Sequence, residues 1–93
     1  MVRSKFHIMK DILIVAAPKG IENKEIEDNI HGASKTYIMN ACGLSFRQRN
    51  EYLSFLKDIK LLEKDKYFEL YVTTEKGLAF LESFNEIQEF STK

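Results

Sequence analysis

One glycine constrains the fold of this chain more than any other residue. Gly43 interrupts a stretch of helical periodicity, and a serine stands near the expected start of a helix on each side, Ser34 before it and Ser45 after it. Serine is a favoured N-cap because its hydroxyl accepts a hydrogen bond from an N–H of the first turn. These positions predict a helix over residues 35–42, a tight turn, and a second helix over residues 46–59.

A further helix is expected on each side of this pair. Ser4 is a candidate cap for a helix over residues 4–17. Apolar side chains recur at helical spacing on one face of this helix, namely Met9, Ile12, Leu13 and Ala16, with Phe6 beside them. The run 12–15 contains three β-branched residues and taken alone would also fit a buried strand. The periodicity begins well before that run, which favours the helix. Downstream, Thr74 is a candidate cap for a last helix over residues 74–90.

A hairpin and an inserted segment complete the expected order. Two β-prone stretches, 61–63 and 67–72, flank the polar turn Lys64-Asp65-Lys66, which predicts a hairpin over residues 61–72. Residues 18–33 form an acidic segment in which a short helix is expected, with Gly32 as its stop. The sequence therefore predicts a single domain over residues 1–93, mainly α in the α+β class.

Composition narrows the possible functions. The 93 residues carry 14 basic and 14 acidic side chains, yet residues 35–60 hold five basic against two acidic ones. Because a field depends on where charge sits, this basic centre can still face an anionic partner. The longest apolar run, 12–17, is too short to span a bilayer, so a cytoplasmic protein without a membrane partner is expected.

Signals of catalysis and metal binding are weak. Cys42 is the single cysteine, which excludes an internal disulfide, and its position suits a small buried side chain. His7 and His31 have no metal-ligand spacing with each other or with Cys42. Motifs for phosphate loops and nucleophile elbows are also lacking in the sequence. We therefore expect no enzyme activity, no cofactor and no metal site.

The order helix, glycine turn, helix, hairpin, helix is that of a winged helix-turn-helix. The segments that fall in step with it are Lys35-Thr36-Tyr37-Ile38-Met39, Gly43-Leu44-Ser45-Phe46, Tyr52-Leu53, Leu56, Leu61-Leu62 and Tyr71-Val72-Thr73-Thr74-Glu75-Lys76-Gly77. Together they resemble the archaeal winged helix-turn-helix regulator-like family, which includes small dimeric chromatin-associated proteins of thermoacidophilic archaea. The resemblance covers roughly residues 5–17 and 34–90. It implies a two-stranded hairpin wing, a C-terminal dimerisation helix, double-stranded DNA as partner and a nucleoid-associated location.

Candidate DNA-binding residues follow from this resemblance. A recognition helix reaches base edges with its N-terminal residues, so Arg47 and Gln48 are the candidates for guanine and adenine respectively. The capped helix start at Ser45 can hold a phosphate. Lys64 and Lys66 at the wing tip are candidates for backbone contact, with a merely solvated surface as the alternative for all of these side chains. The resemblance adds further backbone candidates at the start of the preceding helix: Lys35, Thr36 and Tyr37.

The last helix carries the clearest interaction signal. Its apolar side chains cover more than half of its circumference, which is wider than one core-facing stripe needs. Gly77, Phe80, Phe84 and Ile87 also follow the alternating spacing of a short helix–helix seam. We expect a homodimer whose interface includes Phe80, Phe84, Ile87 and Phe90; the alternative is a helix wrapped deeply into its own core. Relatives usually pair this helix antiparallel.

Phe46, Leu53 and Leu56 cluster on one side of helix 46–59, which is its expected core-facing side. Arg49 departs from the family pattern, because it falls at the centre of this apolar face. A buried guanidinium needs a partner. We hypothesise a carboxylate of the acidic insertion, namely Glu22, Glu25, Glu27 or Asp28. The alternative is that the stem of Arg49 packs while its head reaches a DNA phosphate.

The sequence thus favours a homodimeric double-stranded DNA-binding protein, acting as a transcriptional regulator or in chromatin, from an archaeal cell or an archaeal virus. The alternative is a winged-helix interaction or dimerisation module without significant DNA binding. The neutral total charge, the acidic insertion and the unusual Arg49 are the features that support this alternative.

Overall fold

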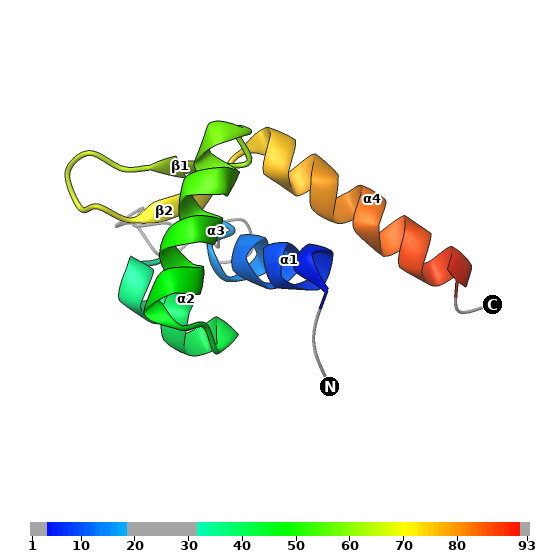
Figure 1. The fold of residues 1–93 in the computed structure, drawn as a ribbon. Coiled ribbons are helices and arrows are strands. Elements are labelled where there is room, and N and C mark those ends of the chain that lie inside the picture. The colour runs from blue at the N-terminus through cyan, green and yellow to red at the C-terminus, as the bar shows by residue number, and fades with distance from the viewer. Residues whose placement is uncertain (1–3, 19–31, 92–93) are drawn as a thin grey trace.

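The structure of the protein is a computed structural model that describes residues 4–18 and 32–91, with side chains described as far as residue 84. The elements run in the order α1 (Lys5–Val15), α2 (Lys35–Cys42), α3 (Phe46–Asp58), β1 (Leu62–Lys64), β2 (Tyr71–Thr73) and α4 (Glu75–Ser91) (Figure 1). Within the described ranges, four helices and a two-stranded antiparallel sheet make a mainly helical winged-helix arrangement, as predicted. The short helix expected within 18–33 lies outside the described residues.

The predicted helix boundaries rest on the caps identified in the sequence. Ser4, Ser34 and Ser45 each adopt an extended conformation, and each hydroxyl accepts a hydrogen bond from the backbone N–H three residues later. Gly43 ends α2 in the left-handed region, at φ 66° and ψ 44°. A side chain is disfavoured there, so glycine makes the tight turn into α3 inexpensive. The three caps and the turn are confirmed.

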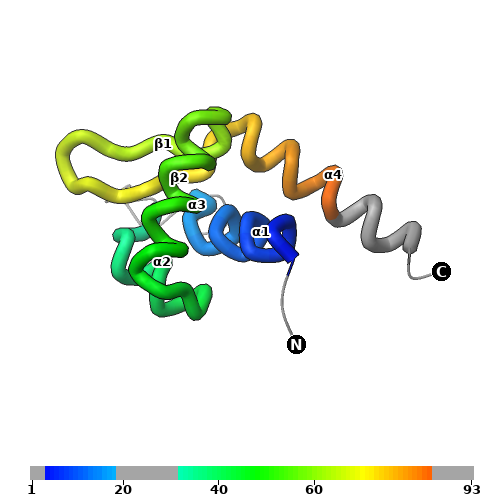
Figure 2. The backbone as a smooth tube through the Cα atoms, in the orientation of Figure 1, coloured from blue at the N-terminus to red at the C-terminus, as the bar shows by residue number. Residues whose placement is uncertain are grey.

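The core lies between α1, the α2–α3 pair and the base of the hairpin (Figure 2). Residues 12–15, which could have formed a strand, belong to α1, and the helix ends at Val15, with Ala16 as its C-cap. Cys42 is buried, as expected. The largest fully buried side chains come from all of these elements: Ile12, Leu13, Ile38, Leu56 and Leu62. Phe6 is an exception to the predicted apolar face of α1, because its position near the helix start leaves it 59% exposed.

The hairpin is shorter than predicted. Leu62 pairs with Thr73 and Lys64 with Tyr71, so residues 65–70 form a loop and 67–70 are not strand. The cause is local turn chemistry, because the Asp65 carboxylate accepts hydrogen bonds from the backbone N–H groups of residues 67 and 68. Glu69 then takes a left-handed φ of 57°, which a strand cannot contain. We call residues 62–73 the wing.

A third extended segment joins the wing. Ala33 and Tyr71 exchange two backbone hydrogen bonds of 2.9 and 2.8 Å. Gly32, interpreted from the sequence as a helix stop, has φ 114°, and a Cβ there would lie 2.5 Å from the Tyr71 carbonyl oxygen. Its role in the described structure is therefore to let the chain approach β2.

The base of the wing is fixed to α1 and α4. The buried Thr73 hydroxyl donates to the Leu13 carbonyl at 2.7 Å, and the Thr73 N–H donates to the Ala16 carbonyl at 3.0 Å. Thr74 caps α4, as predicted, through a hydrogen bond from the Gly77 N–H. A Cβ at Gly77 would lie 2.5 Å from the Leu61 carbonyl oxygen. Gly77 therefore packs against the residue that precedes the wing in its own chain.

Two side chains of the wing–α4 junction also close the C-terminal end of α3. Thr74 donates from its hydroxyl to the Lys60 carbonyl, and the Lys76 ammonium donates to the Ile59 carbonyl at 3.1 Å. These carbonyls follow the last turn of α3, where helical partners are lacking. The C-terminal end of α3 is thus held by Thr74 and by Lys76 of α4. None of the described helices is long and apolar enough to cross a membrane.

Candidate nucleic-acid interface

The N-terminal end of α3 is a reciprocal capping box. Ser45 accepts a hydrogen bond from the Gln48 N–H, and the Gln48 Oε1 accepts one from the Ser45 N–H, both at 3.1 Å. Both residues are exposed, so the helix start faces outward. The box uses one of the two lone pairs of the oxygen that Gln48 would need for a two-bond contact to adenine, and it holds the side chain folded back onto the helix start.

Arg47 projects from the same turn into solvent. Its side chain is 87% exposed, and its Nε donates to Glu51 Oε2 at 3.3 Å across one helical turn. An exposed pair of this kind contributes only about 0.3–0.5 kcal/mol. Arg47 can therefore exchange Glu51 for a guanine edge or a phosphate at small cost.

The start of α2 lies beside the middle of α3. Lys35, Thr36 and Tyr37 are all exposed there. Lys35 lines a hollow of about 210 Å³ between α2, α3 and β2, together with side chains that were not among the candidate DNA-binding residues: Asn50, Ser54, Lys57, Asp58, Leu53 and Tyr71. The sequence could have indicated this group of side chains, because the spacing of positions 50, 54 and 57 places them on one face of α3.

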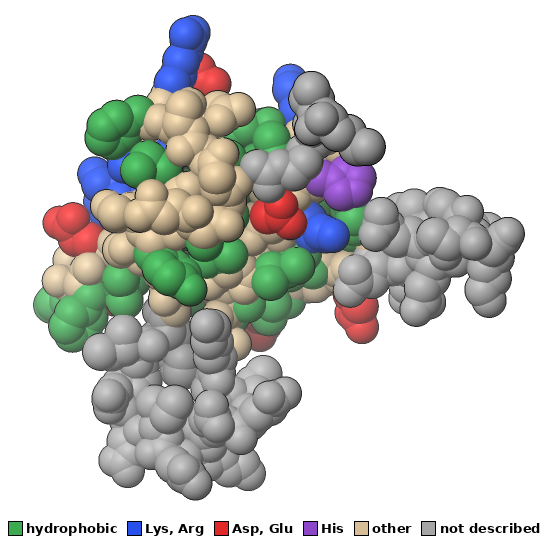
Figure 3. All heavy atoms as spheres, turned by 90° about the horizontal axis from the view of Figure 1, so that it is seen from below, with side chains coloured by type: hydrophobic (Ala, Val, Ile, Leu, Met, Phe, Trp, Pro, Cys, Tyr) green, Lys and Arg blue, Asp and Glu red, His purple; other side chains and the backbone are tan. Residues whose placement is uncertain are grey.

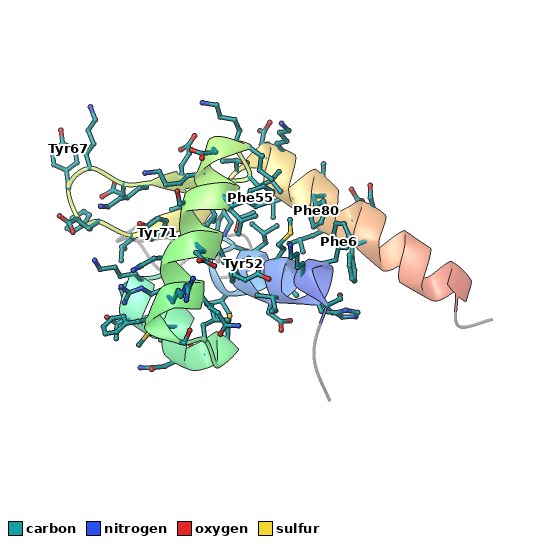
Figure 4. The ribbon with its side chains drawn as sticks, in the orientation of Figure 1. Phe6, Tyr52, Phe55, Tyr67, Tyr71 and Phe80 are labelled. Atoms are coloured by element: carbon teal, nitrogen blue, oxygen red, sulfur yellow. The ribbon has the colours of Figure 1, made fainter. Side chains whose placement is uncertain are left out.

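The wing lysines are split between strand and loop. Lys64 belongs to β1 and is not at the tip; its ammonium lies 6.0 Å from the centre of the Tyr71 ring. Lys66 is in the 65–70 loop and is exposed. The tip also carries two aromatic side chains that the prediction had placed in a strand, Tyr67 at 86% exposure and Phe68 at 64%. Figure 4 shows Tyr67 pointing away from the body, on the wing far from Tyr71.

Arg49 is buried, with 6% of its surface exposed, and its contacts among the described residues are local. Its Nε and Nη2 donate to Asn50 Oδ1 at 3.1 and 2.9 Å, and its Nη1 lies 3.9 Å from Met39 Sδ. Its Cζ stacks 4.6 Å from the centre of the Phe46 ring. The acidic partners hypothesised for Arg49 lie outside the described residues.

Phe46 itself corrects the sequence analysis, which grouped it with the core-facing side chains of its helix. It is 66% exposed, because it occupies the first position of α3, where the α2–α3 turn leaves its outer side uncovered. Its ring instead supports the guanidinium of Arg49. The periodicity of α3 correctly identified Leu53 and Leu56, which are buried.

Charge on the candidate surface is mixed. The basic residues of the interface alternate with carboxylates at Glu51, Asp58, Glu63 and Glu69. Figure 3 shows basic and acidic side chains interspersed on the underside of the molecule. Groups of three His, Cys, Asp or Glu side chains that could hold a metal ion do not occur within the part of the chain that the structure describes.

The predicted dimer residues fall into two groups. Phe80 packs against the core, and the Phe84 ring makes an edge-to-face contact with His7, at 5.5 Å between centroids. The Lys10 ammonium lies 5.3 Å from the centre of the same Phe84 ring. Phe84 therefore contacts α1 of its own chain, and Phe80 packs against the core of the same chain. The side chains of Ile87 and Phe90 lie outside the described part of α4.

Comparisons with known proteins agree with this geometry. A family model described as winged helix-turn-helix matches residues 2–92. The crystal structure of Sso10a-2, described as a DNA-binding protein from Sulfolobus solfataricus, is similar in fold, with a TM-score of 0.65 and 23% identity over 97% of this chain and 86% of that chain. A comparison with curated proteins finds no match. From the element order, the α2–α3 turn, the wing and the family match, the chain belongs to the winged helix-turn-helix family.

Proposed function

We propose that the protein binds double-stranded DNA, with the N-terminal half of α3 in the major groove. The observation that carries the proposal is Arg47, which extends from the capped start of α3 and, among the described residues, is held by a weak surface pair with Glu51. Helix-turn-helix proteins contact base edges with this part of the second helix. The similarity to a structure described as a DNA-binding protein supports the same function.

Phosphate contacts would come from both sides of α3. Lys35 and Lys57 line the hollow between α2, α3 and β2, and Lys66 stands on the exposed loop of the wing. Lysine ammonium groups bind phosphates as point charges and supply affinity without base choice. Because carboxylates accompany these lysines, the net attraction for DNA should be moderate and strongly screened by salt.

The finer proposal is a homodimer that acts in transcriptional regulation or chromatin organisation. Support comes from α4, which runs out past α1 on the side of the body away from the wing (Figure 1). A two-fold pair joined there would present two α3 helices to successive turns of the duplex. Ile87→Asp is the informative variant for light scattering, because a change at Phe84 would also remove its contacts with His7 and Lys10. A single monomer mass for the wild type at micromolar concentration would contradict the dimer.

Duplex binding at several salt concentrations tests the proposed function, with Arg47→Ala compared with wild type. Affinity should fall steeply with salt, and Arg47→Ala should weaken binding by about tenfold or more. Lys60→Asn is a charge-matched control at the other end of α3, about 20 Å away by helical rise. Lys60 has φ 68°, a conformation that asparagine tolerates. Undetectable binding to mixed-sequence duplex at low salt would favour a protein-interaction module instead.

A further inference from the structure

We propose that Asn50 is a specificity residue that presents only hydrogen-bond donors to DNA, because the buried Arg49 occupies its carbonyl oxygen. The inference rests on the proposed DNA-binding function and concerns which base α3 selects. It assigns Arg49 as a positioning residue that acts through Asn50.

The geometry of the Arg49–Asn50 pair fixes the direction of the amide. Arg49 Nε and Nη2 both donate to Asn50 Oδ1, at 3.1 and 2.9 Å. A guanidinium carries five N–H donors and no acceptor, so only the oxygen of an amide can face it favourably. A carbonyl oxygen has two lone pairs, and the two N–H groups of Arg49 use both. The amide nitrogen of Asn50 is therefore the end left for other partners.

Arg49 is itself held firmly in place. Its guanidinium stacks on the Phe46 ring, its Nη1 lies against Met39 Sδ, and the residue is 6% exposed. Turning the guanidinium away from Asn50 would leave buried N–H donors of a cation without an acceptor, which is costly. The pair should therefore persist when DNA binds.

Asn50 lies where it can meet DNA. It is exposed, lies three residues after Arg47 on the outward side of α3, and lines the hollow that Lys35 and Lys57 also line. Residues three and four apart share a helix face, so Arg47, Asn50 and Ser54 form one row along the recognition helix. Arg49 lies beside this row, on the apolar face of α3, where a charged side chain is unusual. Its hydrogen bonds to Asn50 give it a role at that position.

The donor-only state predicts an unusual base preference. Asparagine normally reads adenine with two bonds, accepting from N6–H and donating to N7. With its oxygen occupied, Asn50 loses the first of these bonds. Its amide nitrogen can still donate to the two acceptors of guanine, O6 and N7. We therefore expect guanine to be preferred over adenine at the base that Asn50 contacts.

Selection of preferred sites from a random duplex library, with wild type and Arg49→Met, tests the inference. Methionine keeps an unbranched stem against Phe46 and removes every donor, which frees the Asn50 oxygen. One base position should then change from guanine to adenine preference, by about tenfold in relative affinity. The double variant Arg49→Met with Asn50→Ala should show neither preference at that position, because the effect of Arg49 passes through Asn50. A purely structural role of Arg49 would not produce this dependence.

Two outcomes would overturn the inference. Arg49→Met that folds and selects the same bases as wild type would show that the Arg49–Asn50 pair does not set specificity. Equal weakening on all sequences by Asn50→Ala would assign Asn50 to a phosphate instead of a base.

A measurement on the wild type keeps the test decisive if Arg49→Met does not fold. The NMR signal of the Arg49 Nε–H should be protected from solvent exchange in the free protein and should remain so in the duplex complex. Rapid exchange in either state would show that the oxygen is available, and the inference would fall. Failure of the wild type to bind any duplex at low salt is a different result: it removes the proposed function, and this inference with it, even if the Nε–H signal is protected.

Discussion

The two ends of the wing differ sharply in how they are held. At the base, Thr73 is 2% exposed and bonded to the carbonyl of Leu13, and Gly77 of α4 lies against the Leu61 carbonyl. At the tip, Tyr67 is almost fully exposed, and the described hydrogen bonds come from the loop itself, through Asp65. Figure 4 shows the same contrast between Tyr71, on the body, and Tyr67, beyond it.

Residues that stabilise the fold and residues that are free to contact DNA therefore lie at opposite ends of one hairpin. Substitutions at the base act on the free energy of unfolding, because they disturb buried backbone and side-chain partners. Substitutions at the tip should disturb at most the loop itself and should act mainly on DNA binding. A substitution at the base that changes only DNA binding, or a substitution at the tip that lowers the stability of the whole fold, would contradict this division.

Gly77→Ala should have the largest effect. Its Cβ would lie 2.5 Å from the Leu61 carbonyl oxygen and 2.6 Å from Thr73 Cγ2, so backbone must move to admit it. We expect a loss of about 2–3 kcal/mol in the free energy of unfolding, seen as a fall in Tm of roughly 10 °C or more by circular dichroism. Ser83→Ala, at an exposed position of the same helix, is the control and should leave the Tm nearly unchanged. An unaltered Tm in Gly77→Ala would mean that the wing base is not tightly packed against α4.

Thr73→Val should come next, because valine has the shape of threonine without the hydroxyl. The buried Leu13 carbonyl would lose its donor, at an expected cost of about 1–3 kcal/mol. Chemical denaturation is the suitable measurement, with an unchanged slope and a lower midpoint. Thr36→Val provides the same chemical change at an exposed position. Equal stability of both variants with wild type would contradict the role assigned to the Thr73 hydroxyl.

Asp65→Ala should have a smaller effect on stability, confined to the wing loop. The carboxylate accepts hydrogen bonds from two backbone N–H groups. Because the loop is exposed, water can accept these hydrogen bonds when the carboxylate is removed. We expect a loss below about 1 kcal/mol, with faster amide exchange only at residues 67 and 68 in NMR. Asp58→Ala on α3 serves as a charge-matched control. Faster exchange at Thr73 as well would show that base and tip are coupled.

Lys66→Ala should have the smallest effect, and on DNA binding only. Removing one phosphate contact should lower the slope of log affinity against log salt by about one and leave the Tm unchanged. The slope is obtained from fluorescence titrations of one labelled duplex at four or five salt concentrations. A reduced Tm would place Lys66 among the structural residues of the base, against the comparison made above.

The helical part of the fold could be predicted from the sequence because helix boundaries depend on residues close to each helix end. The serine caps and Gly43 act within one turn, so single residues were enough to place α2 and α3. The wing was less predictable, because β propensity at 67–70 competes with the Asp65 turn, and the turn prevails where the loop has no strand to pair with. The Ala33–Tyr71 bridge depends on residues far apart in the chain and has no local signal.

The candidate site was predictable only in part for a similar reason. Periodicity identifies the apolar face of a helix but not what covers it, which is why Phe46 was assigned to the core and is exposed. The position of Arg49 on the apolar face of α3 was recognised from the sequence, whereas its burial was left open and its contact with Asn50 was not predicted. Neighbouring residues on a helix point about 100° apart. A side chain needs the length of arginine to bend back and contact the side chain of the next residue.

Residue-resolved NMR of the labelled protein, titrated with a duplex at low salt, tests the central claim most directly. Signals of residues 45–48 at the start of α3 and of the wing loop 65–69 should shift together, while Thr73 and Gly77 at the wing base should not. Shifts confined to α4 and α1, or no shifts at all, would contradict the account and point to an interaction module that works through its other side.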